Sequence, residues 1–207
     1  MKSYNDALKI LKKSDIKITN ELIKSIDSLN RICSENIYSN YNYPSADNSS
    51  LDGFAVNSKD TNHVSKKKSK RFKIIGSISA GSKPFKKFLK KDQAVEIMTG
   101  GILPKGTNTV IPIEKCLLSK EKTNNYISIK QKFKKFENVR FKGSDYKKKD
   151  LLIKKNTLIN SNHIMAFKAL GIGNIKVKKK INITFFSSGN EISENNHISD
   201  WKIRNSN

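Results

Sequence analysis

Four short runs of β-forming residues between positions 72 and 129 constrain the fold more than any other feature of this sequence. They cover residues 72–75, 95–98, 109–113 and 126–129. Clusters of Gly, Pro, Asn and Lys separate them, as is typical of a small all-β domain. Two runs of charge, residues 66–68 before the first β run and 86–91 between the first and the second, are expected to be exposed turns.

The flanking regions have helical periodicity instead. Ser3 can cap a helix whose apolar residues recur from Tyr4 to Leu11. A second helix is predicted over residues 25–37, and a third begins at Ser161 and stops at Gly171. Residues 38–50 between them favour an extended crossing segment. The overall prediction is a mixed α+β, multidomain fold.

The last apolar run, residues 181–186, is predicted to be a buried strand that ends in a turn containing glycine. Such a strand is typical of the start of a doubly wound α/β domain, with ligand groups at its carboxyl end. Residues 187–207 are too few to complete a sheet. The expectation is therefore that the chain stops just inside its next domain.

Composition limits the class of protein. Hydrophobic residues make up 36% of the chain and the net charge is +23, but only four of the 41 basic residues are arginine. Dedicated readers of phosphates and bases rely on the planar guanidinium, so dispersed lysine favours a solvated surface with a field that attracts small anions. No apolar run approaches the ~18 residues that span a bilayer. Two distant cysteines and no signal peptide indicate a cytoplasmic protein.

Three segments carry polar groups suited to chemistry. Residues 44–55 read PSADNSSLDGFA, and place carboxylates and hydroxyls beside a glycine that allows a ligand to approach the backbone. Residues 97–106 read IMTGGILPKG, in which backbone N–H groups near Thr99 and Gly100 could face an anion. Residues 138–145 read NVRFKGSD, and Arg140 is placed as an anion clamp. The same residue types also build capped turns, hairpin connections and surface salt bridges.

Together these segments resemble the molybdopterin molybdenumtransferases. The first is similar to the family's Pro-x-x-Asp-Asn-Ser-x-Met-Asp-Gly-Tyr-Ala, with Leu51 and Phe54 as mild changes. The second resembles Ile-Met-Thr-Gly-Ala-x-Leu-Pro-x-Gly. The third resembles Asn-x-Arg-x-x-Gly-Glu-Asp, with Ser144 in place of Glu. A fourth, SSGNEI at residues 187–192, is similar to Ser-Thr-Gly-Asp-Glu-Leu, with Asn190 in place of Asp.

The resemblance implies that molybdate is inserted into adenylylated molybdopterin with release of AMP and with Mg²⁺ as cofactor. It suggests Asp52, Thr99, Asp145 and Glu191 as catalytic residues, with Glu191 also as a magnesium ligand. The substrate-binding residues that it suggests are Ser49, Gly100, Arg140 and Ser188.

The resemblance also implies an elongated α/β linking domain (residues 1–45 and 138–178) and an inserted β-rich domain (46–137). Residues 179–207 would start an incomplete molybdopterin-binding α/β domain, on which the first helix is expected to pack. The expected assembly is a homodimer with an active site between subunits, and a separate C-terminal half is a further expected partner.

Two alternatives remain from the sequence. Ser144 and Asn190 favour a catalytically inactive binding or scaffold fragment that keeps the family fold. The charge favours a basic nucleic-acid-binding module, but scarce arginine and the absence of an aromatic stacking pattern argue against it. No specific nucleic acid and no membrane are expected as partners.

Overall fold

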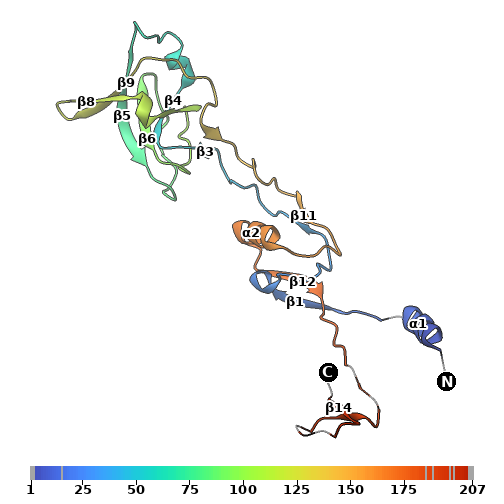
Figure 1. Ribbon diagram of the computed structural model, residues 1–207. Coiled ribbons are helices and arrows are strands. Elements are labelled where there is room, and N and C mark those ends of the chain that lie inside the picture. Colours follow the sequence, from blue (N-terminus) through green and yellow to red (C-terminus); the bar gives the residue numbers. More distant parts are fainter. Residues whose placement is uncertain are drawn as a thin grey trace.

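The protein is mostly β-structure with few helices and has an elongated outline in the computed structural model (Figure 1). The structure describes residues 3–14, 16–184, 186–187, 189–195, 197 and 199–204. A six-stranded sheet lies at one end of the molecule, and both chain termini lie toward the other (Figure 1). In the described part of the chain, no helix combines the length and apolar character needed to cross a lipid bilayer.

The largest sheet has the strand order β7-β4-β6-β5-β9-β8. Its strands are β4 (Gly53–Val56), β5 (Lys70–Ile78), β6 (Gln93–Ile97), β7 (Thr109–Pro112), β8 (Leu117–Glu121) and β9 (Asn124–Ile129). Neighbouring strands are antiparallel except β5 and β6, which are parallel. All four β runs expected from the sequence lie largely within these strands, but β4 and β8 were not expected.

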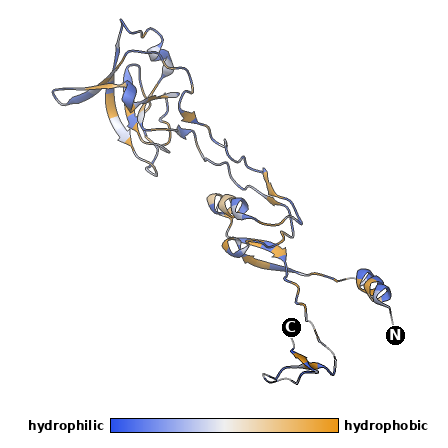
Figure 2. Cartoon of the chain, viewed as in Figure 1, coloured by the Kyte–Doolittle hydropathy of each residue, from blue (hydrophilic) through white to orange (hydrophobic). Residues whose placement is uncertain are grey.

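Both faces of this sheet are buried along β4, β6 and β7. Successive residues of a strand point to opposite faces, and Phe54 and Ala55 accordingly belong to two different hydrophobic clusters. Phe72 and Ile127 extend the cluster on the Phe54 face, while Val95 extends the one on the Ala55 face. The apolar colouring of Figure 2 follows the strands, whereas the loops between them are mainly hydrophilic. Burial on both faces explains why these strands read as short continuous apolar runs.

A second core lies in the middle of the molecule. It contains two small antiparallel sheets, one of β1 (Asn20–Lys24) with β12 (Asn174–Lys178) and one of β2 (Ile37–Tyr38) with β11 (Leu151–Ile153). The helix α2 (Ser161–Ala169) contributes Phe167, which is fully buried. Cys33, Ile153, Ile159, Ile175 and Val177 complete this cluster of buried residues.

A two-stranded ladder joins the two cores. Residues 37–49 and 139–153 run antiparallel, from the pair of β2 and β11 at one end to the pair of β3 (Asn48–Ser49) and β10 (Val139–Arg140) at the other. Between them the Tyr43 N–H donates to the Tyr146 carbonyl (2.7 Å), and the Ser39 N–H donates to that of Asp150 (2.9 Å). The extended segment expected at residues 38–50 is therefore confirmed as one arm of this ladder.

Two of the three expected helices are present. α1 (Tyr4–Lys13) begins as predicted, because the Ser3 hydroxyl accepts a hydrogen bond from the Asp6 N–H (3.2 Å). α2 is capped by Asn160, one residue earlier than expected, and Gly171 follows it with a φ of +67°. Such a conformation is the usual stop for a helix.

The prediction of a helix over residues 25–37 is wrong. Only a 3-10 turn, η1 (Ser25–Asp27), forms there. Asn30 adopts a φ of +60°, which ends any helix, and the Asn30 and Cys33 N–H groups donate to Ile159 and Thr157. Pairing with a distant segment therefore overrides the apolar periodicity. Two other 3-10 turns are η2 (Ser58–Thr61) and η3 (Ile113–Lys115).

The strand expected at residues 181–186 is also absent among the described residues. Positions 181–184 and 186 have no regular structure, and Phe185 lies outside the described residues. A parallel strand needs neighbours for its backbone hydrogen bonds, and no described segment pairs with this one. The only strands nearby are β13 (Ile192–Ser193) and β14 (Ile203–Arg204), which pair with each other.

The close packing of β4 against β7 explains why a glycine, Gly53, follows Asp52. A Cβ atom at this position would lie 2.0 Å from the carbonyl oxygen of Ile111 on the neighbouring strand β7. The contact is with backbone, so no side-chain rotation relieves it. A glycine here lets β4 and β7 pair closely.

We predict that Gly53→Ala lowers the free energy of unfolding by about 3 kcal/mol, because β4 and β7 must separate. Thermal or urea unfolding measures this loss. Gly173→Ala is the matched control, since a Cβ there meets no atom within 4 Å, and its effect should stay within about 0.5 kcal/mol. Equal stability of the two variants would contradict the close approach of the strands.

Candidate functional site

The three motif segments found in the sequence meet at β3. On one side, Ser49 pairs with Val139 of β10. On the other, the Ser49 N–H donates to the Gly101 carbonyl (2.9 Å), and the Gly100 N–H donates to the Ser49 carbonyl (2.8 Å). Residues separated by about fifty or ninety positions in the chain are thereby brought next to one another, as expected for a built site rather than for independent turns.

Asp52 and Thr99 form the best-defined contact of the site. The carboxylate Oδ1 of Asp52 accepts hydrogen bonds from both the backbone N–H (2.7 Å) and the hydroxyl (2.8 Å) of Thr99. Both side chains are exposed. The backbone hydrogen bond, followed by that of the hydroxyl, lowers the pKa of Asp52 below its ordinary value of 3.8. Asp52 is therefore a fixed, ionised carboxylate that solvent can reach.

The backbone of residues 99–101 does not form the anion site expected from the sequence. The N–H of Thr99 donates to Asp52, that of Gly100 to Ser49, and that of Gly101 to the Met98 carbonyl (2.8 Å). Each donor is already occupied inside the protein. The glycines instead allow the tight turn, in which Gly100 has a φ of +80° and a Cβ at Gly101 would lie 2.9 Å from the carbonyl oxygen of Met98.

Arg140 and Asp145 are brought together as an ion pair. Ser144, which replaces a family glutamate, donates its hydroxyl to the other carboxylate oxygen of Asp145 (3.1 Å). The guanidinium carbon of Arg140 also lies 5.8 Å from the centre of the Tyr43 ring. Arg140 is thus held by a carboxylate in this structure, and an incoming anion would compete with Asp145 for it.

Glu191 lies apart from these residues. It belongs to the C-terminal segment next to β13 and β14, at the opposite end of the molecule from β4 and β6 (Figure 1). Ser188, expected to bind substrate, lies outside the described residues. Within the described ranges, no group of three His, Cys, Asp or Glu side chains is placed to share a metal ion. A magnesium ion at Glu191 would need its other ligands from elsewhere.

Two side chains of the first motif have contacts that the sequence reasoning missed. The Asp47 carboxylate accepts the N–H of Lys142 (2.8 Å), which ties the first motif to the third. Asn48 is 9% exposed, and its side-chain oxygen has no hydrogen-bond partner in the structure. Both residues lie inside the first motif, and that position was the signal in the sequence that could have indicated these contacts.

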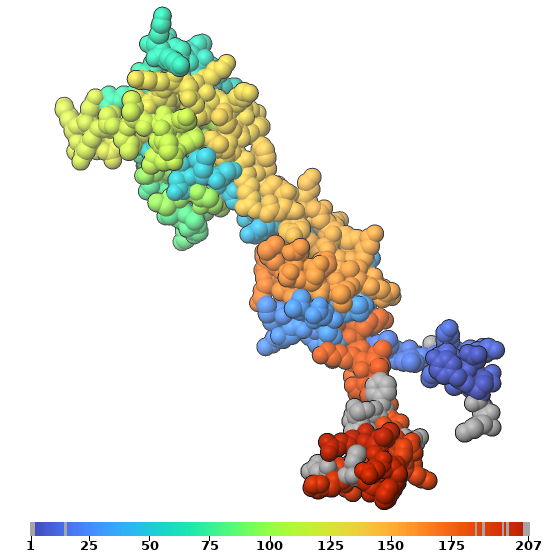
Figure 3. All heavy atoms as spheres, in the orientation of Figure 1, coloured from blue at the N-terminus to red at the C-terminus, as the bar shows by residue number. Residues whose placement is uncertain are grey.

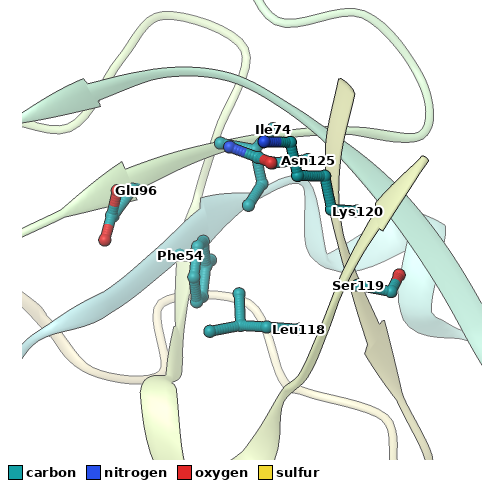
Figure 4. Close-up of a pocket in the computed structure, with 7 residues that line it drawn as sticks. All are labelled: Phe54, Ile74, Glu96, Leu118, Ser119, Lys120 and Asn125. Atoms are coloured by element: carbon teal, nitrogen blue, oxygen red, sulfur yellow. The ribbon is translucent and has the colours of Figure 1, made fainter. Parts of the chain in front are cut away.

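Two of the cavities near the sheet are candidates for part of the site. One of about 340 Å³ is lined by all three motif segments, including Asp47, Ile102 and Val139. Another, of about 420 Å³, lies between the Phe54 face of the sheet and the hairpin of β8 and β9 (Figure 4). There Phe54 and Leu118 face each other, with Glu96 at one side and Lys120 at the other. Only the first cavity joins the three motifs, so we favour it as part of the site.

Comparison with known proteins decides the family. The family model described as the MoeA N-terminal region (domain I and II) matches residues 2–171 of the chain. The chain belongs to this family. The match extends from α1 to the turn after α2, so it includes all three motif segments that meet at β3.

Relatives named molybdopterin molybdenumtransferase match much of the chain. One from Staphylococcus epidermidis (strain ATCC 35984) is 32% identical over 206 residues, covering 99% of this chain and 48% of the relative. One from Staphylococcus aureus (strain Mu50) is 35% identical over 181 residues, covering 87% and 42%. The chain therefore spans about half the length of these relatives.

A solved structure shares the fold. It is the crystal structure of a molybdopterin biosynthesis moea protein from Pyrococcus horikosii, which matches with a TM-score of 0.79 and 33% sequence identity. The match covers 97% of this chain and 50% of that one. The mostly β architecture with few helices is thus an arrangement that this family adopts.

We predict that Thr99→Val raises the pKa of Asp52 while leaving it below 3.8, because the backbone donor remains when the hydroxyl is lost. Since folding lowers this pKa, the pair stabilises the fold above pH 3.8, and that contribution is lost as pH falls through the lowered pKa. Carboxyl chemical shifts of Asp52 measured by NMR titration test the change. Thr107→Val, whose hydroxyl bonds Pro104, is the control, and an unchanged Asp52 titration in Thr99→Val would refute the contact.

Proposed function

We propose that the chain contributes to molybdenum cofactor biosynthesis, as the N-terminal part of an enzyme that inserts molybdate into adenylylated molybdopterin and releases AMP. The observation that carries this proposal is the Asp52–Thr99 pair, held where the three family motifs meet. The names of the relatives and of the solved structure that shares the fold support it. Free cysteines at positions 33 and 116 are consistent with a cytoplasmic reaction.

In this proposal Asp52 acts as a base or orienting group. An ionised carboxylate accepts hydrogen bonds only, so it would orient a water molecule or a protonated oxygen of molybdate rather than attract the bare oxyanion. Thr99 keeps that carboxylate ionised and fixed. Arg140 and nearby lysines would supply the positive charge that an oxyanion needs, once the ion pair of Arg140 with Asp145 has opened.

Glu191 is proposed to serve a different part of the reaction. A magnesium ion is commonly bound by one or two carboxylates together with substrate phosphates, and Glu191 would supply one such ligand. When bound, the ion would neutralise charge that develops as the phosphate link breaks. Ser49, Gly100 and Ser188 stay proposed as substrate contacts, although the Gly100 N–H is already bonded to Ser49.

We also propose the domain division and the assembly. The linking domain would comprise residues 1–45 and 138–178, the β-rich domain residues 46–137, and the α/β domain would begin at 179. The strand β4, which follows Asp52, and the strand β14, in the segment that contains Glu191, lie at opposite ends of the molecule (Figure 1). A single site can include both residues only if they come from two subunits, which supports a homodimer with shared active sites.

The first test joins this chain to the remaining C-terminal half of the Staphylococcus epidermidis relative. The chimera should release AMP from adenylylated molybdopterin only when molybdate is present. Asp52→Asn should reduce this turnover by about 100-fold or more, because an amide cannot accept a proton as the carboxylate does. Its melting temperature should stay within about 2 °C, since the amide oxygen of the new side chain still accepts both hydrogen bonds from Thr99.

A chimera with no molybdate-dependent AMP release would instead favour a catalytically inactive scaffold. Full activity in Asp52→Asn would show that this carboxylate has no catalytic role. Ser144→Glu, which restores the family residue beside Asp145, distinguishes a weakened enzyme from a scaffold, because only the former should gain turnover.

The second test mixes two inactive chimeras, Asp52→Asn and Glu191→Gln. In a shared-site homodimer, a mixed pair rebuilds one intact site, so random exchange should restore about a quarter of the original activity. The measurement is AMP release after refolding the two variants together, compared with each alone. No recovery, with mixed dimers confirmed by mass spectrometry, would mean that each subunit carries a complete site.

A further inference from the structure

A recess rich in lysine lies on the large sheet and shares no residue with the three motif segments. It is formed by η2, the turn at residues 65–68, the start of β5 and the turn before β6. This part of the chain is in the end of the molecule that lies away from both termini (Figure 3). The residues that line it are Lys59, Asp60, His63, Val64, Lys68, Ser69, Lys70 and Lys91.

The charges of this recess are not balanced. Lys70 forms an ion pair with Asp92, in which Nζ and Oδ1 are 2.5 Å apart. Among the described residues, no ion pair joins Lys59, Lys68 or Lys91 to a carboxylate. With His63 neutral, the four lysines of the lining exceed Asp60 and the paired Asp92 by two positive charges. The single lining carboxylate, Asp60, also accepts the Asp92 N–H (3.2 Å).

Charges of one sign that converge on a recess repel each other, and the field that they make there is stronger than on a flat surface. A multivalent anion removes this repulsion. The cavity measures about 380 Å³, which is enough for a tetrahedral oxyanion or a small phosphate ester. Ser69, whose side chain carries an uncharged donor, also lines the recess.

We propose that this recess binds a multivalent oxyanion, either free molybdate or the phosphate group of a nucleotide. Both present several anionic oxygens, which lysine ammonium groups and a hydroxyl recognise. The site is separate from Asp52 and Thr99. It stands independently of the proposed reaction.

The lining favours a small anion over a nucleic acid. It contains no arginine and none of the large aromatic side chains Phe, Tyr and Trp. Single-stranded nucleic acids are held along extended grooves in which bases stack on aromatic rings. A confined recess of lysines offers neither the length nor the stacking surface.

Equilibrium dialysis of the 207-residue chain at physiological ionic strength tests the proposal, with molybdate, inorganic pyrophosphate and AMP as separate probes. We expect one saturable site per chain for at least one probe. The double variant Lys59→Gln/Lys91→Gln should weaken its binding by about tenfold or more. Lys68→Gln/Ser69→Ala is a second variant of the lining and should act in the same direction.

The matched control is Lys86→Gln/Lys87→Gln, which removes the same charge from an exposed segment outside the recess. It should change binding by less than about twofold. Both recess variants leave Asp52 and Thr99 unaltered, so this site and the proposed reaction are tested separately. Tighter binding of molybdate than of pyrophosphate or AMP identifies the free oxyanion as the ligand, and the reverse order identifies a phosphate group.

Two outcomes overturn the proposal. Equal weakening in the recess variants and in the control would mean that anions respond only to the overall charge. Binding of a single-stranded oligonucleotide that the recess variants abolish, and with which none of the three small anions competes, would assign the surface to nucleic acid instead.

Discussion

The site depends on a few backbone hydrogen bonds at Ser49. This residue pairs with Val139 on one side and exchanges hydrogen bonds with Gly100 and Gly101 on the other. Its own hydroxyl bonds the Leu51 carbonyl, which shapes the turn toward Asp52. Because main-chain groups make these contacts, the geometry depends little on the identity of the neighbouring side chains.

The same crossing explains why the family motifs contain glycine. Gly53 allows β4 to approach β7, and the lack of a Cβ atom at Gly101 allows its backbone to lie close to the Met98 carbonyl oxygen. The Gly101 N–H donates to the Met98 carbonyl, so this glycine serves the turn rather than offering a backbone donor to a ligand. Close packing of backbone against backbone positions Asp52 and Thr99, whose side chains then remain free to face solvent.

The sequence predicted those parts of the fold whose signal is local. The strand at residues 109–112, the cap at Ser3 and the helix stop at Gly171 each depend on nearby residues. The helix expected at residues 25–37 failed, because Cys33 and Asn30 pair with residues more than a hundred positions away. The exposed strand β8 was missed since all of its residues face solvent, so it has no apolar alternation.

The candidate site was predictable in its members but not in their contacts. The motifs indicated Asp52, Thr99, Arg140 and Asp145, yet nothing in the spacing shows that Arg140 meets Asp145 or that the Gly100 N–H is occupied. The ladder that carries these residues has a consequence of its own. Its arms keep one register from the pair of Tyr38 and Leu151 to that of Tyr43 and Tyr146, and an irregularity between Leu151 and Ile153 already shifts it. In the stretch between these pairs, a slip of one residue would turn alternate side chains to the opposite face. A residue inserted in one arm there needs a matching residue in the other arm or a further bulge. The length of the ladder, which separates the Asp52–Thr99 pair from the core around Phe167, therefore changes most easily in matched steps.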